Sequence, residues 1–163
     1  MTFLRLLVAL LSLVGLPALA EPVLPKFLAE VPAETLVPEA EAYGPIDATH
    51  PVVPVLKDGE TIAWAFITTD FVSTTGYSGK PIHTLVAVDK DARIVGLKLV
   101  KHSEPIVLIG IPQAKIDAVV QAYVGLDLVA EAQSGGTGHD VDIISGATVT
   151  VMVIDDSIVR AGL

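Results

Sequence analysis

Three strand-like segments follow one another closely in the middle of the chain, and they limit its fold more than any other feature of the sequence. They cover residues 61–69, 82–88 and 93–101. In the first segment, Ile62, Trp64 and Phe66 fall on one face of an extended strand, as in a half-buried strand. The last two segments are joined by the short turn 89–92, and strands joined in this way pair in antiparallel order. We therefore expect an antiparallel meander as the nucleus of the fold.

Residues with helical spacing follow the strands. Apolar side chains at positions 116, 119, 120 and 123 predict an amphipathic helix that opens at Pro112 and ends near Gly125. The last segment is ambiguous, since the β-branched residues from Val149 to Ile154 favour a strand, whereas positions 147, 151, 154 and 158 fall on one helical face. Residues 106–111 and 133–139 are interpreted as loops. These features predict an α+β fold, in which an antiparallel sheet and packed helices form a single domain.

The first 20 residues have the features of a secretory signal peptide. Arg5 supplies a positive charge, residues 6–16 are an apolar stretch, and small residues precede a cleavage point after Ala20. The apolar stretch is shorter than the roughly 20 residues that a membrane-spanning helix needs. We expect residues 21–57 to form an extended, proline-rich lead-in and residues 58–163 to form the domain itself.

Composition excludes several functions. The chain has no cysteine, so it cannot form disulfides or bind iron–sulfur clusters through cysteine. Its 4 histidines lie far apart without the spacing of metal ligands, so we expect no metal. With 19 Asp and Glu against 10 Lys and Arg, the chain is acidic, which argues against nucleic acid as a partner and favours encounter with a basic protein surface.

Residues 142–148 carry the strongest functional signal, the run DIISGAT. The run resembles the Asp-x-x-Ser/Thr-Gly-Ala-Thr pattern that periplasmic flavin transferases modify, and this resemblance implies that Thr148 becomes a phosphoester of FMN. Gly146 and Ala147 are small and leave the hydroxyl unhindered, while Asp142 could position metal or substrate during transfer. If Ser145 caps a helix starting near Gly146, free N–H groups and the helix dipole would face the phosphate.

The same run could also have a purely structural role. Ser145 and Gly146 would then form a turn, Thr148 would be a surface hydroxyl and Asp142 a cap, because short patterns also arise by chance.

Longer stretches strengthen the resemblance. Residues 75–83, 102–112 and 142–156 are together similar to the N-terminal periplasmic flavin domain of NosR/NirI-type proteins, which support nitrous oxide respiration. More distantly the chain resembles the flavin subunits of Rnf and sodium-pumping NADH:quinone oxidoreductase complexes, whose corresponding stretch has a His-x-Glu-Thr-Pro-Gly-Leu-Gly form. In this chain Pro105 directly follows Glu104, which favours the NosR type.

The resemblance also bears on membrane association. Full NosR-type proteins are expected to continue into membrane helices and cysteine-rich segments, so the chain is either a fragment or a free-standing version of the domain. Contact with the inner membrane would come from such C-terminal segments or from an uncleaved signal.

We expect two walls around the isoalloxazine ring of FMN, made by Tyr77, Ser78, Gly79 and Lys80 on one side and by the loop from Glu104 to Gly110 on the other. Tyr77 or Trp64 could stack on the ring. Lys80 near the pyrimidine edge would stabilise the negative charge of reduced flavin and raise its potential. The alternative places Trp64 in the core, Tyr77 as a loop anchor and Lys80 in solvent.

Residues 76–81 match neither of two known functional motifs that they resemble in part. A nucleophile elbow needs glycine where Lys80 stands, and a phosphate loop needs a serine or threonine where Pro81 stands. A hydrolase using Ser78 is disfavoured, because no acid–base partner is spaced to support it.

The sequence and the resemblance together favour a periplasmic electron carrier or regulatory domain over a stand-alone enzyme. The resemblance implies that this domain takes part in the maturation or upkeep of nitrous oxide reductase and in its regulation. Its implied partners are a flavin transferase and a redox protein of the nitrous oxide reductase system. Covalent attachment keeps the flavin at high effective concentration in a compartment where it would otherwise be diluted. A non-redox module that binds a ligand or a protein stays open as the alternative.

Overall fold

The computed structural model describes residues 21–135, 139 and 146–163. The predicted signal peptide, residues 1–20, lies outside the described residues, and so do Asp142 and Ser145 of the flavin motif.

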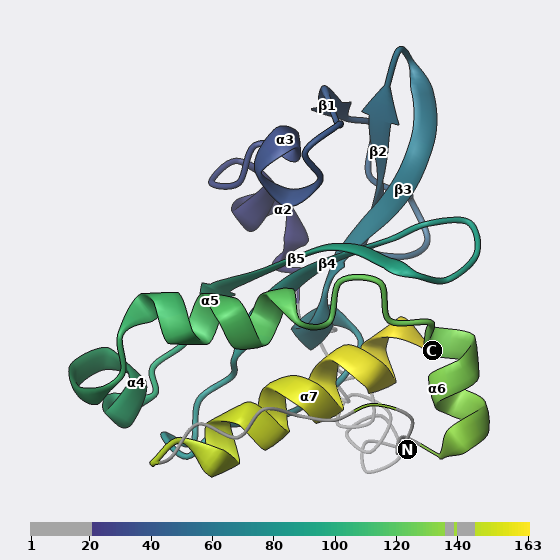
Figure 1. Ribbon diagram of the computed structural model, residues 1–163. Coiled ribbons are helices and arrows are strands. Elements are labelled where there is room, and N and C mark those ends of the chain that lie inside the picture. The colour runs from purple at the N-terminus through teal and green to yellow at the C-terminus, as the bar shows by residue number, and fades with distance from the viewer. Residues whose placement is uncertain (1–20, 136–138, 140–145) are drawn as a thin grey trace, which may run out of the picture.

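The fold is built on one antiparallel sheet (Figure 1). Its strands are β1 (Ala42–Tyr43), β2 (Val52–Lys57), β3 (Glu60–Ile67), β4 (His83–Val88) and β5 (Ile94–Lys101). Each strand pairs with the next one along the chain, so the spatial order is β1-β2-β3-β4-β5. The predicted meander is therefore confirmed, and it gains two strands from the segment before residue 58.

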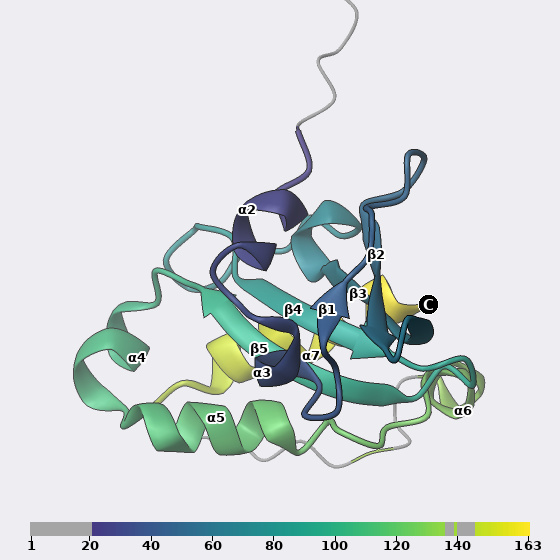
Figure 2. The same ribbon diagram turned by 90° about the horizontal axis from the view of Figure 1, so that it is seen from above.

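Helices lie on both faces of the sheet, so the structure has three layers (Figure 2). The N-terminal helices are α2 (Leu24–Leu28) and α3 (Ala33–Leu36), and the 3-10 helix η1 (Thr68–Asp70) follows β3. The other face carries α4 (Pro105–Gly110), α5 (Gln113–Gln121), α6 (Leu128–Ser134) and α7 (Thr148–Gly162). The expected α+β architecture in a single domain is confirmed. Among the described helices, none is long and apolar enough to span a bilayer.

Alternation along β3 divides the interior into two cores. Ala63, Ala65 and Ile67 are buried on the face covered by α2 and α3, whereas Phe66 is buried on the face covered by α5–α7. Successive side chains of a strand point to opposite faces of the sheet, so one strand can contribute to both cores. The N-terminal segment therefore forms one of the layers that cover the sheet. Its backbone is held by the Asp70 carboxylate, which accepts hydrogen bonds from the N–H groups of Val23 at 2.8 Å and Leu24 at 3.0 Å.

The last segment is a helix, which resolves the ambiguity of its sequence. Ala147 at the N-cap of α7 and Val151, Ile154 and Ile158 within the helix are all buried in the core between α7 and the sheet, which matches the helical face noted in the sequence. Burial of this apolar stripe outweighs the modest strand preference of β-branched residues. The helix begins at Thr148, two residues later than expected, with Ala147 at its N-cap.

Two other helices differ from the sequence prediction. The expected loop 106–111 was wrong, because residues 105–110 form α4, with Glu104 at the N-cap and Pro105 at the first helical position, where its missing N–H costs nothing. Helix α6 takes up two residues of the expected loop 133–139, and it is capped by the Asp127 carboxylate, which accepts a hydrogen bond from the N–H of Ala130.

Candidate functional site

A cavity of about 280 Å³ lies where three segments distant in sequence meet. They are the connection from β3 to β4, the start of α4 and the start of α7, and the last two lie at the same end of the molecule in Figure 1. The residues that line it are Tyr77, Glu104, Pro105, Ile106, Gly146, Ala147, Thr148, Val149 and Thr150.

The start of α7 brings an exposed threonine and an uncapped helix end to this cavity. Gly146 has a φ of +89°, a left-handed conformation that favours glycine, and it turns the chain into the helix. Ala147 at the N-cap has no side chain that could accept a hydrogen bond from the first turn. Thr148 is exposed. The N-terminus of this 15-residue helix therefore offers backbone N–H donors and a partial positive charge next to the Thr148 hydroxyl.

Glu104 ties the three segments together. Its side chain is only 1% exposed. One carboxylate oxygen, Oε2, accepts hydrogen bonds from the Thr150 hydroxyl at 2.7 Å and from the N–H of Tyr77 at 3.0 Å, and Oε1 accepts one from the N–H of Ser78 at 3.2 Å. Because these donors come from α7 and from the β3–β4 connection, one carboxylate fixes the relative position of both walls of the cavity.

The environment of Glu104 favours its ionised form. Burial raises the pKa of this carboxyl, but the hydrogen bonds from Thr150, Ser78 and Tyr77 outweigh burial and leave the pKa below its usual value. Glu104 is also the only charged side chain among the described residues that line the cavity.

Gly76 gives the carboxylate its space. A β-carbon at this position would overlap both oxygens of Glu104. A glycine is therefore required for the Tyr77–Ser78 backbone to approach Glu104, which is the close backbone approach that glycine allows.

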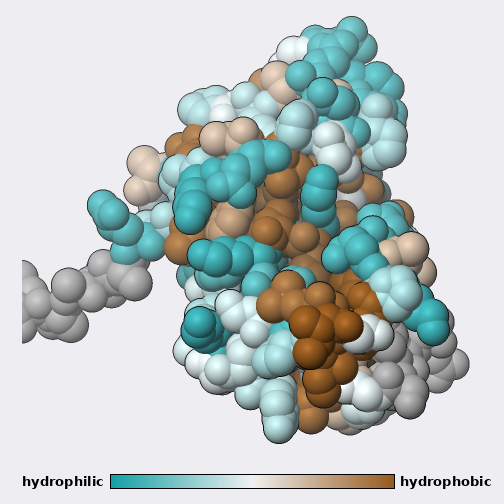
Figure 3. Space-filling view, turned by 90° about the vertical axis from the view of Figure 1, so that its left-hand side faces the viewer, coloured by the Kyte–Doolittle hydropathy of each residue, from teal (hydrophilic) through white to brown (hydrophobic). Residues whose placement is uncertain are grey.

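Exposed apolar side chains lie on the segments that line the cavity. Tyr77 is 71% exposed and Ile109 is 89% exposed, and Leu108, Val149 and Met152 are exposed nearby in sequence on the same elements. Figure 3 shows hydrophobic side chains gathering on the face that carries α4. Exposed apolar groups that cluster in this way mark a site of binding more often than a chance surface.

The structure brings together about half of the residues that the sequence singled out. Tyr77, Glu104, Gly146, Ala147 and Thr148 all line the cavity. Ser78 reaches it only through its backbone bond to Glu104.

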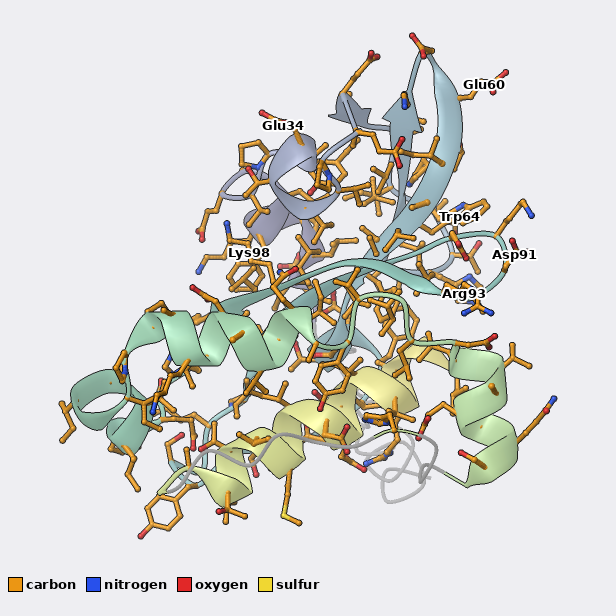
Figure 4. The ribbon with its side chains drawn as sticks, viewed as in Figure 1. Glu34, Glu60, Trp64, Asp91, Arg93 and Lys98 are labelled. Atoms are coloured by element: carbon orange, nitrogen blue, oxygen red, sulfur yellow. The ribbon has the colours of Figure 1, made fainter. Side chains whose placement is uncertain are left out.

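Other predicted contacts do not line the cavity. Gly79 and Lys80 are both exposed and lie outside it, and Gly110 lies at the other end of α4 from Glu104. Trp64 lines a separate cavity beside β2 and β3, and Figure 4 shows it near Arg93 and Asp91.

Sequence reasoning missed Thr150 and Gly76. Thr150 is buried and bonded to Glu104. Thr150 lies three residues after Ala147 and one before Val151, both of which are on the buried face of α7. In a helix this spacing places Thr150 at the edge of the same face, so the sequence did contain a signal for its burial.

A second polar cluster joins α6 to α7. The His139 ring lies between two carboxylates, with Nε2 2.8 Å from Oδ1 of Asp155 and Nδ1 3.0 Å from Oε1 of Glu131. The second contact has the distance of an ion pair without the alignment of a hydrogen bond. The Tyr123 hydroxyl donates to the same Asp155 oxygen at 2.9 Å.

These contacts change the titration of the histidine. Burial lowers the pKa of His139, but the neighbouring Asp155 and Glu131 outweigh burial and raise the pKa above its usual value. These contacts favour the protonated form of the ring, which lies between Glu131 of α6 and Asp155 of α7. In the part of the chain that the structure describes, no group of three or more His, Asp or Glu side chains is arranged so that it could hold a metal ion.

Comparison with known proteins identifies the family. Residues 76–161, more than half of the chain, match the family described as FMN-binding domain. The chain is 40% identical to Protein NirI of Paracoccus denitrificans over 163 residues, and the match covers 96% of this chain and 23% of that protein. It is 38% identical to the Regulatory protein NosR of Pseudomonas aeruginosa over 128 residues, covering 76% of this chain and 18% of that protein.

A third relative is named as part of a complex. One component of an ion-translocating oxidoreductase complex of Stutzerimonas stutzeri is 29% identical over 131 residues, covering 76% of this chain and 55% of that component. The chain spans about a fifth of the length of the NirI and NosR proteins that it matches.

Proposed function

Because the chain belongs to the FMN-binding domain family, we propose that it is a periplasmic electron-transfer domain that carries FMN as a phosphoester on Thr148. One observation carries the proposal. Thr148 is an exposed residue at the uncapped N-terminus of α7, on the wall of a largely apolar cavity. A phosphate joined to this oxygen would meet the N–H groups and the positive end of the helix, which stabilise anions.

The neighbouring hydroxyl explains why Thr148 would be the residue modified. Thr150 lies on the same helix, but its side chain is buried and donates to Glu104 at 2.7 Å. A transferase that needs an accessible hydroxyl can therefore reach Thr148 but not Thr150.

The residues around the cavity fit a flavin. Bound FMN supplies one- and two-electron chemistry, and the protein supplies binding, orientation and electrostatics. Tyr77, Ile106 and Val149 offer apolar surface to an aromatic ring system. A cavity of about 280 Å³ is slightly smaller than the roughly 300–1,000 Å³ of pockets that enclose a drug-sized ligand, so it would cover part of FMN and leave the rest open to a redox partner.

The setting of this domain is part of the proposal. The signal-like first 20 residues support export to the periplasm, where a flavin transferase would attach the cofactor. The similarity to NirI and NosR supports a redox partner in the nitrous oxide reductase system and a role in its maturation, upkeep or regulation. The similarity to a component of an ion-translocating oxidoreductase complex supports the electron-transfer role itself.

In-gel flavin fluorescence after denaturing electrophoresis tests the proposal. The protein is exported in a host that contains flavin transferase, and the unchanged chain is compared with Thr148→Val and with Thr150→Val, which removes a hydroxyl two residues further along α7. We expect a fluorescent band for the unchanged chain and for Thr150→Val, and none for Thr148→Val. A dark band from folded, unchanged protein would refute covalent attachment and favour the non-redox binding module.

A further inference from the structure

We propose that Glu104 sets the electrostatics of the cavity, and that its carboxylate lowers the reduction potential of FMN bound there. The inference rests on the proposed function and goes beyond it, since it assigns to one side chain a control over how readily the flavin accepts electrons.

The charge is fixed in place. Both carboxylate oxygens of Glu104 are held by hydrogen bonds from Thr150, Tyr77 and Ser78, at distances from 2.7 to 3.2 Å. The side chain is 1% exposed although it lines the cavity, so water cannot screen it as water screens a surface carboxylate. Both oxygens already accept hydrogen bonds from protein donors, so the position of the charge is fixed before any ligand binds.

The charge is also uncompensated. Within the described part of the chain, Glu104 makes no ion pair with a lysine, arginine or histidine, and it is the only charged residue that lines the cavity. The hydrogen bonds that hold it favour the carboxylate over the neutral acid, so the charge persists at neutral pH.

A fixed negative charge acts on flavin reduction in one direction. Uptake of two electrons and one proton by FMN adds one negative charge to its ring system. A nearby carboxylate repels that added charge and makes reduction less favourable, so the midpoint potential falls. Lys80, which the sequence suggested as a counter-charge that raises the potential, is exposed and does not line the cavity.

A structural role alone would give a different result. If Glu104 only held the cavity walls together, its replacement would change stability and the amide exchange of Tyr77 and Ser78, but the potential of attached flavin would not shift in a defined direction. The potential is therefore the measurement that separates the two roles.

The test is a redox titration of flavin-loaded protein at pH 8, with the flavin absorbance as readout. Glu104→Gln keeps the shape of the side chain and removes its charge. We expect a rise in the reduced-to-oxidised ratio of at least tenfold at a given applied potential, which equals about 30 mV for a two-electron couple. Glu60→Gln makes the same change at the tip of the β2–β3 hairpin, away from α4 and α7 in Figure 4, and should leave the potential unchanged.

Thr150→Val gives a second test with the opposite sign. It keeps the carboxylate but removes the donor that partly neutralises it, so the midpoint potential should fall below that of the unchanged protein. If Glu104→Gln does not fold or does not load flavin, the midpoint potential of Thr150→Val tests the inference in its place.

The outcomes separate this inference from the proposed function. Flavin-loaded Glu104→Gln with an unchanged or lower potential overturns the inference, and so does an unchanged or higher potential in Thr150→Val. Unchanged protein that carries no flavin overturns the proposed function instead. In flavin-free protein, amide hydrogen exchange should show faster exchange at Tyr77 and Ser78 in Glu104→Gln, because their acceptor is weakened.

Discussion

Replacement of Thr150 by valine in flavin-free protein measures how strongly Glu104 fastens α7 to the rest of the site. The change deletes one hydroxyl and keeps the branched shape of the side chain. The lost hydrogen bond is 2.7 Å long, joins two buried groups and has an ionised acceptor. Hydrogen bonds to charged groups contribute about 1.5–3 kcal/mol, so we expect the free energy of unfolding to fall by about that amount.

Thermal and urea unfolding followed by circular dichroism would measure this loss. For a domain of this size each kcal/mol lowers Tm by about 2–4 °C, which predicts a decrease of roughly 3–12 °C. The urea midpoint should fall with little change in slope, since the surface exposed on unfolding stays the same.

The matched control is Thr148→Val, the same chemical change two residues earlier, where the hydroxyl is exposed. Its effect on the free energy of unfolding should stay within about 0.5 kcal/mol, as for most surface substitutions. If Thr150→Val is as mild as Thr148→Val, the hydrogen bond between α7 and Glu104 contributes little to stability, and Glu104 does not fasten the helix to the site.

Two further predictions concern stability. Gly76→Ala should lower the free energy of unfolding by about 1–3 kcal/mol through overpacking, because the new methyl group overlaps the Glu104 carboxylate. Gly110→Ala should be neutral or slightly stabilising, because its methyl group would lie 4.0 Å from the nearest neighbour. Equal urea midpoints for the two variants would contradict this prediction. The pKa of His139 is raised in the folded protein, so its protonation should contribute stability that is fully present below about pH 6.5 and is lost as pH rises through the folded pKa. In urea unfolding, the loss of unfolding free energy caused by His139→Gln should therefore be largest at pH 6 and smaller at pH 9. A loss that grows with pH would show that the pKa is shifted in the opposite direction.

The sheet could be predicted from sequence because its signals are local, whereas the C-terminal segment stayed open between a strand and a helix. Alternation in residues 61–69 and the short turn 89–92 specify neighbouring strands without reference to the rest of the chain. The spacing of Ala147, Val151 and Ile154 was compatible with the buried face of a helix, but the β-branched residues of the same segment favoured a strand, and only packing against the rest of the fold decides between the two.

The short helix α4 could not be predicted in this way. Six residues are too few to show a helical period, and the apolar run that begins at Ile106 is equally typical of a buried strand or a loop. Its N-terminal Pro105 is compatible with a helix start but also occurs in turns.

The site was predicted in part. A motif identified Thr148, and Tyr77 and Glu104 were expected on its walls, where the structure has them. As contacts of flavin these residues stay predictions. The inward orientation of Glu104 and its bond to Thr150 depend on tertiary contact between residues 46 positions apart, which no local pattern contains.

The meander topology has a consequence for the order of folding. Strands that pair only with their chain neighbours form contacts of short sequence separation, and such contacts form early because little loop entropy is lost. Helix α7 follows all five strands in the chain and must dock across them to reach the Glu104 carboxylate. We therefore expect the segment that bears Thr148 to be among the last to join the folding protein, so that the finished acceptor site would exist only on chains that have completed their core.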